Sequence, residues 1–212
     1  MTGQKELDAK KAEMASILMK IDALKFGVFK LTSGKASPYY VDLRVVPSFP
    51  DAFTRICDFY AQAITSQIGL KTFDRIAGVP IAGIPFASQI AYNLKKPFLY
   101  IRKGLRRHGR QRRVEGILVS GDRVLLVDDL VTTGLTLRKA AESVRAEGGV
   151  VEKAVAFMDR EEGGREKLAK NGIQLTTLLK ISEVAKILYD VGSLDEESFK
   201  TIMKQVEKGK NN

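Results

Sequence analysis

The chain has 212 residues, a formal net charge of +10 at pH 7 and 44% hydrophobic residues, which is enough apolar side chain for the core of a globular domain. It contains no apolar run of about 18 residues, and its charged beginning, MTGQKELDAKKAEM, lacks the apolar stretch of a signal peptide, so we expect a cytoplasmic protein without a membrane span. The single cysteine, Cys57, excludes an internal disulfide, and with only one histidine in the chain a zinc site is not expected.

The positive charge indicates an anionic partner, which can be nucleic acid, a phosphorylated metabolite or a membrane surface. Much of this charge lies in one basic run with no acidic residue before Glu115: Arg102, Lys103, Arg106, Arg107, Arg110, Arg112 and Arg113. Taken alone, such a run favours a nucleic-acid patch, but it contains no aromatic residue on which a base could stack. The lysines near both ends of the chain alternate with acids, which is typical of solvated helix faces.

The first third of the chain predicts two helices and an antiparallel element between them. Residues 6–25 carry apolar side chains at helical spacing. Residues 26–44 alternate apolar and polar positions around a Ser-Gly turn, which favours a short hairpin. Residues 51–68 predict a second helix, and Cys57 lies on it among apolar residues, so we expect a buried, inert thiol.

Five short, β-branched apolar runs follow: Ile76–Val79, Phe98–Ile101, Val124–Val127, Val151–Phe157 and Leu175–Leu179. Helical patterns over residues 86–94, 137–147 and 165–170 separate most of them. Apolar strands that alternate with helices predict an α/β fold with a parallel sheet of about five strands, covered by helices on both faces.

We expect one domain over residues 1–212. Residues 1–50 would form the N-terminal helix and a small hood, residues 51–180 the α/β core, and residues 181–212 the C-terminal helices. Ser193 and Glu196 have the spacing of a capping box for the last of these helices.

The most informative segment is VLLVDDLVTTGLT, residues 124–136. Its strand ends in Asp128 and Asp129, and a Thr-Thr-Gly loop leads to a helix that Thr136 opens. In open parallel sheets, ligands bind at the carboxyl ends of the strands. Backbone N–H groups, threonine hydroxyls and a helix N-terminus together suit a phosphate. Two carboxylates beside that phosphate make sense if they bind sugar hydroxyls or hold a cation; the alternative is an ordinary loop followed by a helix cap.

Residues 124–136 resemble the phosphoribosyl pyrophosphate (PRPP) signature of type I phosphoribosyltransferases, which implies the fold of that family. On this resemblance, Asp128 and Asp129 bind the ribose 2- and 3-hydroxyls. The segment that follows would bind PRPP around its 5-phosphate: Leu130, Val131, Thr132, Thr133, Gly134, Leu135 and Thr136.

Four further segments are similar to the orotate branch of this family: residues 24–44, 78–87, 101–109 and 158–164. The resemblance implies Mg²⁺-dependent transfer of the phosphoribosyl group from PRPP to orotate in de novo pyrimidine synthesis. The products would be orotidine 5′-monophosphate and pyrophosphate. It also implies a homodimer with shared active sites.

The same resemblance assigns the remaining roles. Arg102, Lys103, Arg106 and His108 would bind the pyrophosphate end of PRPP, with Arg106 and His108 counted as catalytic beside the acidic pair. Cations in this position make physical sense, because the leaving pyrophosphate must be neutralised as its bond breaks. The orotate site would contain Arg160, which binds the carboxylate, with Thr132, Tyr39 and Tyr40 near the ring. No side chain is assigned as a direct metal ligand.

The chain also departs from the family pattern. Thr32 stands where some members have lysine, and Arg106-Arg107 stands where lysine and aspartate are common. Arg110, Arg112 and Arg113 receive no role. Two alternatives remain: a phosphoribosyltransferase for another nucleobase, and a PRPP-sensing regulator that binds nucleic acid. The segments at 24–44 and 158–164 argue against the first, and the lack of a DNA-reading module argues against the second, so nucleic acid is not the expected partner.

Overall fold

The structure, a computed structural model, describes residues 2–30, 34, 36–104 and 112–210. Its N-terminal part contains helix α1 (Thr2–Lys20), strands β1 (Leu24–Lys30) and β2 (Ala36–Val41), the 3₁₀ segment η1 (Leu43–Ser48), helix α2 (Pro50–Ala63) and the π-helical turn η2 (Ile64–Ile68). No helix among the described residues is long and apolar enough to cross a membrane.

The rest of the chain alternates strands and helices and then ends in two helices. The elements are β3 (Arg75–Gly78), α3 (Gly83–Leu94), β4 (Phe98–Ile101), β5 (Val114–Glu115), β6 (Arg123–Val131), α4 (Leu135–Ala146), β7 (Val150–Asp159), α5 (Gly164–Ala169), β8 (Gln174–Lys180), α6 (Ile181–Asp190) and α7 (Glu196–Lys210).

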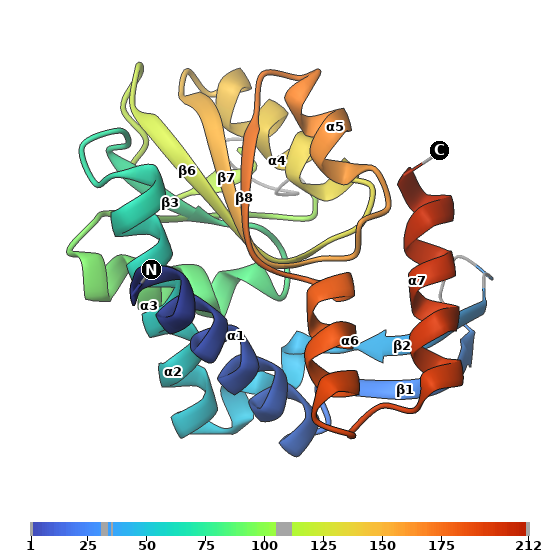
Figure 1. Ribbon diagram of the computed structural model, residues 1–212. Helices are drawn as coiled ribbons and strands as arrows, with labels where there is room; N and C mark the ends of the chain where they lie inside the picture. The colour runs from blue at the N-terminus through green and yellow to red at the C-terminus, as the bar shows by residue number, and fades with distance from the viewer. Residues whose placement is uncertain (1, 31–33, 35, 105–111, 211–212) are drawn as a thin grey trace.

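The central sheet has six strands in the order β5-β4-β3-β6-β7-β8. Strands β3, β6, β7 and β8 of this sheet are labelled in Figure 1. Strands β4, β3, β6, β7 and β8 are parallel, which confirms the predicted parallel sheet. The sixth strand, β5, pairs antiparallel with the edge strand β4. It is too short, at two residues, to leave a hydrophobic pattern in the sequence.

Side chains alternate between the two faces of this sheet, and helices cover both. Along β6, Leu125 and Val127 point into a core shared with α1, α2, α3 and α6, while Val124 and Leu126 point into a second core under α4 and α5. A strand buried on both faces is apolar at successive positions, which explains the uninterrupted runs in the sequence. Cys57 lies in the first core, and burial raises the pKa of its thiol to about 12, as expected for an inert cysteine.

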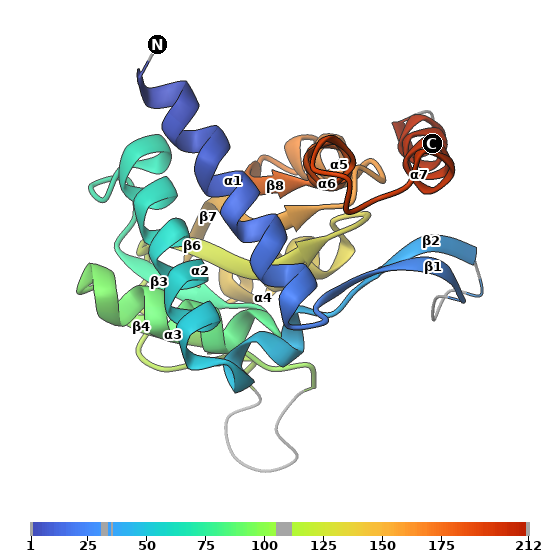
Figure 2. The ribbon, with the colours of Figure 1, turned by 60° about the horizontal axis from the view of Figure 1, so that its bottom comes forward.

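The antiparallel hood formed by β1 and β2 projects from one side of the molecule (Figure 2). The C-terminal helices complete this region, because α7 packs against β2 and α6 packs against α1. The hood and the C-terminal helices are therefore in contact. The boundaries near residues 50 and 180 stay a prediction.

Four predicted features of element ends differ from the structure, and two of them concern where an element ends. Helix α1 ends at Lys20 rather than near residue 25, because Asp22 adopts a left-handed conformation (φ 58°) and the Ala23 N–H bonds back to the Leu18 carbonyl at 2.9 Å. Strand β6 extends to Val131, since it stays paired with β7 beyond the acidic pair.

The other two differences concern helix beginnings. Helix α4 begins at Leu135 rather than Thr136. The expected cap of α7 at Ser193 is wrong, because the Asp195 carboxylate accepts the Ser198 N–H at 2.8 Å and caps this helix instead.

Candidate active site

Asp128 and Asp129 lie within β6, near its carboxyl end. Asp128 is 5% exposed and Asp129 is partly exposed. Asp128 is fixed from two sides: its Oδ1 accepts the Asp129 N–H at 3.0 Å, and its carbonyl oxygen accepts the Tyr60 hydroxyl at 2.6 Å. Tyr60 belongs to α2 and is fully buried. The hydrogen bond from Tyr60 in the core therefore holds the backbone of Asp128 in place.

Burial raises the pKa of Asp128 well above its ordinary value, and the neighbouring Asp129 charge raises it further. Burial also raises the pKa of Asp129, although the hydrogen bond from Asp128 and the charge of Arg44 oppose this effect. In the free protein, burial thus disfavours ionisation of both carboxyl groups. Hydrogen-bond donors or a cation brought by a ligand would favour the fully ionised form.

Glycines allow two neighbouring elements to approach the acidic pair and its loop closely. A Cβ on Gly83, the first residue of α3, would lie 2.6 Å from the Val127 carbonyl oxygen and 2.9 Å from the Asp128 Cα. The segment before α3, residues 79–82, thus starts beside the acidic pair. A Cβ on Gly164, the first residue of α5, would collide with the Thr132 carbonyl oxygen.

The loop after β6 bends sharply at Gly134, which has a φ of 74°. A side chain there would be strained by this conformation, and its Cβ would lie 2.9 Å from Leu168 and 3.0 Å from the Gly164 carbonyl oxygen. Gly134 also precedes the first turn of α4, whose free N–H groups and dipole favour an anion. Thr132 is partly exposed, and Thr133, Leu135 and Thr136 are exposed.

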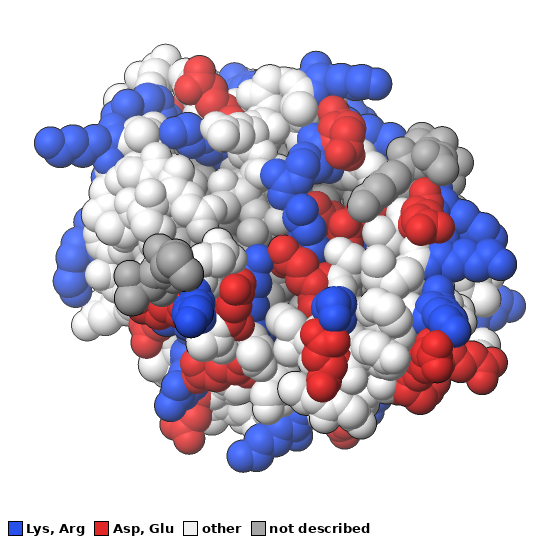
Figure 3. Space-filling model, in the orientation of Figure 1, with Lys and Arg blue, Asp and Glu red and all other residues white. Residues whose placement is uncertain are grey.

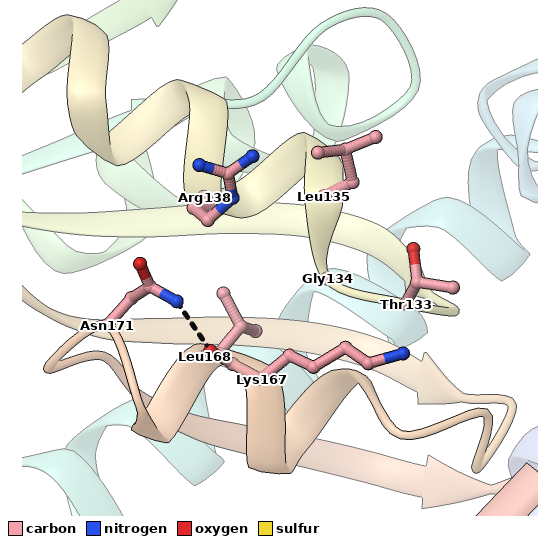
Figure 4. Close-up of a pocket in the computed structure, with 7 residues that line it drawn as sticks. All are labelled: Thr133, Gly134, Leu135, Arg138, Lys167, Leu168 and Asn171. Carbon is pink, nitrogen blue, oxygen red and sulfur yellow. Dashed lines mark hydrogen bonds between the residues drawn. The ribbon is translucent and has the colours of Figure 1, made fainter. Parts of the chain in front are cut away.

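A cavity of about 380 Å³ lies beside this loop, between α4 and α5 (Figure 4). Its lining combines loop residues with two basic side chains and an asparagine whose amide is bonded to α5: Thr133, Gly134, Leu135, Arg138, Lys167, Leu168 and Asn171. Arg138 is paired with Glu142 at 2.5 Å. The two cations add positive potential next to the loop.

Arg160 follows β7 and lies next to the loop, because its N–H donates to the Val131 carbonyl oxygen at 2.9 Å. The side chain is buried, at 7% exposure for the residue. Its Nε donates to the Tyr39 hydroxyl at 3.1 Å and lies 3.0 Å from Glu162 Oε1, and its Nη2 donates to the Ser37 hydroxyl at 3.4 Å. A buried cation thus meets the inner face of the hood.

Tyr39 and Tyr40 point to opposite faces of β2, as neighbouring residues of a strand do. Tyr39 is fully buried against Arg160. The Tyr40 hydroxyl accepts a hydrogen bond from Arg44 at 3.1 Å, and its ring lies 5.7 Å from that of Phe29. The structure therefore brings only the Tyr39 side chain to Arg160, and a contact of Tyr40 with substrate stays a prediction.

The described ends of the basic run meet at the edge of the sheet. Arg102 donates its N–H to the Arg113 carbonyl oxygen at 2.9 Å, and its guanidinium is paired with Glu115 at 3.0 Å. Lys103 is exposed. The Glu147 carboxylate accepts the Arg113 N–H and lies 4.0 Å from Arg112. Arg106 and His108, with Arg107, Arg110 and Thr32, lie outside the described residues.

No group of three or more His, Cys, Asp or Glu side chains that could hold a metal occurs in the part of the chain that the structure describes. The carboxylates of Asp128 and Asp129 are nevertheless of the type that Mg²⁺ prefers.

Known proteins with similar sequences decide the family. Residues 50–187 match the model of the phosphoribosyl transferase domain. The orotate phosphoribosyltransferase of Staphylothermus marinus is 42% identical, over 88% of this chain and 90% of that protein. The chain belongs to the orotate phosphoribosyltransferase family.

Solved structures agree with this family in fold. The crystal structure of orotate phosphoribosyltransferase from Aeropyrum pernix superposes with a TM-score of 0.74 at 32% identity, over 86% of this chain and 99% of that one. Leishmania donovani UMP synthase superposes with a TM-score of 0.82 at 30% identity, over 93% of this chain but 42% of that one. The predicted type I phosphoribosyltransferase fold is confirmed.

The family signature did not point to every residue around the site. Tyr60, Ser37 and Glu162 contact the acidic pair or Arg160. Ser37 and Glu162 lie within the family-like segments 24–44 and 158–164 but received no role from the resemblance, and Tyr60 lies outside all of these segments. A signal did exist for Ser37, because it lies two residues from Tyr39 on one strand and must share its face. Tyr60 left no comparable signal, since its partner is 68 residues away.

Proposed function

We propose that this member of the orotate phosphoribosyltransferase family transfers the phosphoribosyl group of PRPP to orotate. The reaction forms orotidine 5′-monophosphate and releases pyrophosphate, within pyrimidine synthesis in the cytoplasm. One observation carries the proposal: an acidic pair whose first member, Asp128, is buried, a glycine-containing loop at a helix N-terminus and the buried Arg160 meet at the carboxyl ends of β6 and β7.

In this proposal each group has a distinct role. Asp128 and Asp129 accept hydrogen bonds from the ribose 2- and 3-hydroxyls, which orients the anomeric carbon. The 5-phosphate binds to the N–H groups and hydroxyls of residues 130–136, at the positive end of α4. Arg160 binds the orotate carboxylate, because a planar guanidinium matches a carboxylate in bidentate geometry. Thr132 lies between the two substrates.

Mg²⁺ would supply charge neutralisation of the leaving pyrophosphate. The carboxylates of Asp128 and Asp129 would balance its charge. Arg102, Lys103, Arg106 and His108 would bind the same pyrophosphate. We further propose a homodimer in which this basic run serves the partner's site.

The nucleic-acid alternative has less support. The face of the molecule in Figure 3 carries basic and acidic side chains interspersed, rather than a continuous basic stripe. Many arginines are also neutralised by acids, as Arg75 is by Asp122 and Arg123 by Asp74.

The decisive experiment measures the loss of orotate absorbance when PRPP and Mg²⁺ are added to the protein. Hypoxanthine, adenine and uracil serve as alternative acceptors. We expect turnover with orotate alone. Turnover with another base and not with orotate would overturn the assignment in favour of a different phosphoribosyltransferase, and specific nucleic-acid binding without turnover would favour a regulator.

A further inference from the structure

The Arg160 guanidinium is hydrogen-bonded along one edge, the edge formed by Nε and Nη2, which is called its inner edge below. A guanidinium has one N–H at Nε and two at each terminal nitrogen, all in one plane. Here Nε donates to the Tyr39 hydroxyl at 3.1 Å, and one N–H of Nη2 reaches the Ser37 hydroxyl at 3.4 Å. The guanidinium carbon also lies 4.9 Å from the centre of the Tyr39 ring. Tyr39 therefore contacts Arg160 through both its ring and its hydroxyl.

The two hydroxyls are themselves fixed. Ser37 is 2% exposed, and its hydroxyl donates to the Tyr39 carbonyl oxygen at 2.7 Å. The same oxygen accepts the Tyr39 N–H at 3.5 Å, and its second lone pair can accept from Arg160. Burial raises the pKa of the Tyr39 phenol despite the nearby Arg160 charge, so its hydroxyl stays neutral at any ordinary assay pH. Both groups therefore act as hydrogen-bond acceptors on the inner face of β2.

The charge of Arg160 has its own partner in Glu162. Glu162 Oε1 is buried and lies 3.0 Å from Nε, but it makes no hydrogen bond, so the contact is one of charge. A buried cation with a nearby carboxylate costs less to desolvate than one without. This contact is at Nε, the nitrogen that also donates to the Tyr39 hydroxyl.

The hydrogen bonds at the inner edge of the Arg160 guanidinium affect how a ligand can bind to the side chain. A free arginine side chain loses considerable conformational freedom when it is fixed on a ligand. Here the hydrogen bonds of Nε and Nη2 fix the side chain before the ligand arrives. Within the described part of the chain, Nη1 donates no hydrogen bond, so the edge formed by the two terminal nitrogens offers N–H groups to a bidentate carboxylate.

We propose that Tyr39 and Ser37 are positioning residues. Their hydroxyls preorganise Arg160 to bind the carboxylate of orotate. This inference rests on the proposed function and extends it to two residues of the hood. It makes recognition of the carboxylate depend on the docking of β2 against the end of β7.

The test compares Tyr39→Phe and Ser37→Ala with the wild type in steady-state kinetics. Tyr39→Phe keeps the ring over the guanidinium and removes only the acceptor. We expect KM for orotate to rise about three- to tenfold, as for the loss of one immobilised side chain. KM for PRPP should change less than about twofold. Direct titration of orotate should show the same weakening, while inhibition by uracil, which lacks the carboxylate, should not change.

Tyr92→Phe is the matched control. Tyr92 lies on α3, 70% exposed, with Lys95 Nζ 4.2 Å from its ring centre. The substitution therefore removes a hydroxyl from another tyrosine that carries a cation over its ring, far along α3 from Gly83. Neither KM should change.

Two results would overturn the inference. One is an unchanged KM for orotate in both variants. The other is an equal rise of KM for orotate and KM for PRPP together with a large fall in Tm, in Tyr39→Phe and in Ser37→Ala alike. This result would mean that the hydroxyls only support the fold. If the wild type does not consume orotate at all, the proposed function fails instead, so the two failures are distinguishable.

Discussion

At the residue scale, the site is built around groups whose burial is unfavourable without a ligand. Asp128 is nearly inaccessible and its carboxyl pKa is raised by burial. Its backbone cannot easily relax, since Tyr60 and Gly83 hold it from two sides. Such strain at a functional site implies that removing the charge should stabilise the free protein.

The first prediction follows from that raised pKa. Above the ordinary pKa of an aspartate, about 4, the unfolded chain releases the Asp128 proton while the folded chain retains it. This linkage lowers stability as the pH rises toward the folded pKa. Asp128→Asn does not titrate, so the ligand-free variant should have a higher Tm than the wild type at pH 7, by about 2–4 °C per kcal/mol relieved. The difference should vanish below about pH 4.

Thermal unfolding between pH 3.5 and 8 measures this difference directly. Asp58→Asn on α2 is the control, because Asp58 is exposed. A Tm of Asp128→Asn at or below that of the wild type at pH 7 would show that Asp128 carries no such strain.

The second prediction concerns catalysis. The double variant Asp128→Asn, Asp129→Asn should fold but lose most of its kcat/KM. Each lost charge-assisted hydrogen bond to ribose costs roughly 1.5–3 kcal/mol. Near wild-type kcat/KM for orotate would refute the assignment of this pair to the ribose.

The third prediction separates the two substrates. Arg160→Ala should raise KM for orotate about 10- to 100-fold, as expected for the loss of a charge-assisted pair. KM for PRPP should stay nearly constant, since the proposal places this substrate beside β6 rather than at Arg160. Equal changes in KM for orotate and KM for PRPP would mean that Arg160 stabilises the fold and does not bind orotate.

At the scale of elements, α7 supports the loop that carries Arg160 and Glu162. A Cβ on Gly209 would lie 2.5 Å from the Glu161 carbonyl oxygen and 3.3 Å from the Glu162 Cα. The same helix packs against β2. A segment without any recognised motif therefore contacts both the hood and the loop beside Arg160.

The fourth prediction uses this close contact. A glycine in a helix is normally improved by alanine, by up to about 1 kcal/mol. Gly209→Ala should do the opposite: it should lower Tm and raise KM for orotate, because the added methyl group pushes on the Glu161 backbone. Gly3→Ala in α1, where a Cβ meets nothing within 4 Å, is the matched control and should not lower Tm. If both variants behave alike, α7 does not support the site.

At the scale of the whole molecule, the open question is how the basic run reaches a substrate. Its described ends meet at the β4–β5 edge of the sheet, held by Glu115 and Glu147. The loop of residues 132–136 follows the carboxyl end of β6, which lies two strands away from β4 in the sheet order. In the proposed homodimer, Arg106 and His108 of one chain complete the site of the other.

The fifth prediction tests that sharing. One inactive variant carries Arg106→Ala and His108→Ala, and the other carries Asp128→Asn and Asp129→Asn. The two are unfolded together and refolded as an equal mixture. Random pairing makes half of the dimers mixed, and each mixed dimer has one intact site, so about a quarter of the wild-type activity should return.

Native mass spectrometry shows whether mixed dimers form. If they are present and the mixture stays inactive, each chain uses its own basic run and the shared site is refuted. The transferase assignment would stand, because it depends on the acidic pair and the family rather than on assembly.

The amino-acid sequence by itself determined the parallel sheet and pointed to the loop of residues 132–136 as the candidate PRPP site. Both are encoded locally: a strand buried on two faces must be apolar along its length, and the acidic pair, glycine loop and helix start are contiguous in residues 124–136. The family resemblance pointed to Arg160 in the same way, since its segment could be read in isolation.

Only the tertiary structure decided what surrounds those groups. Arg160 meets Tyr39 and Ser37 across 121 and 123 residues of chain, and Asp128 meets Tyr60 across 68. The period of a strand separates the Tyr39 and Tyr40 faces, but it does not say which face meets the arginine. That choice, like the burial that raises the pKa of Asp128, depends on how the hood and α2 pack against the ends of β6 and β7, because burial is a property of the packed core and not of any single segment.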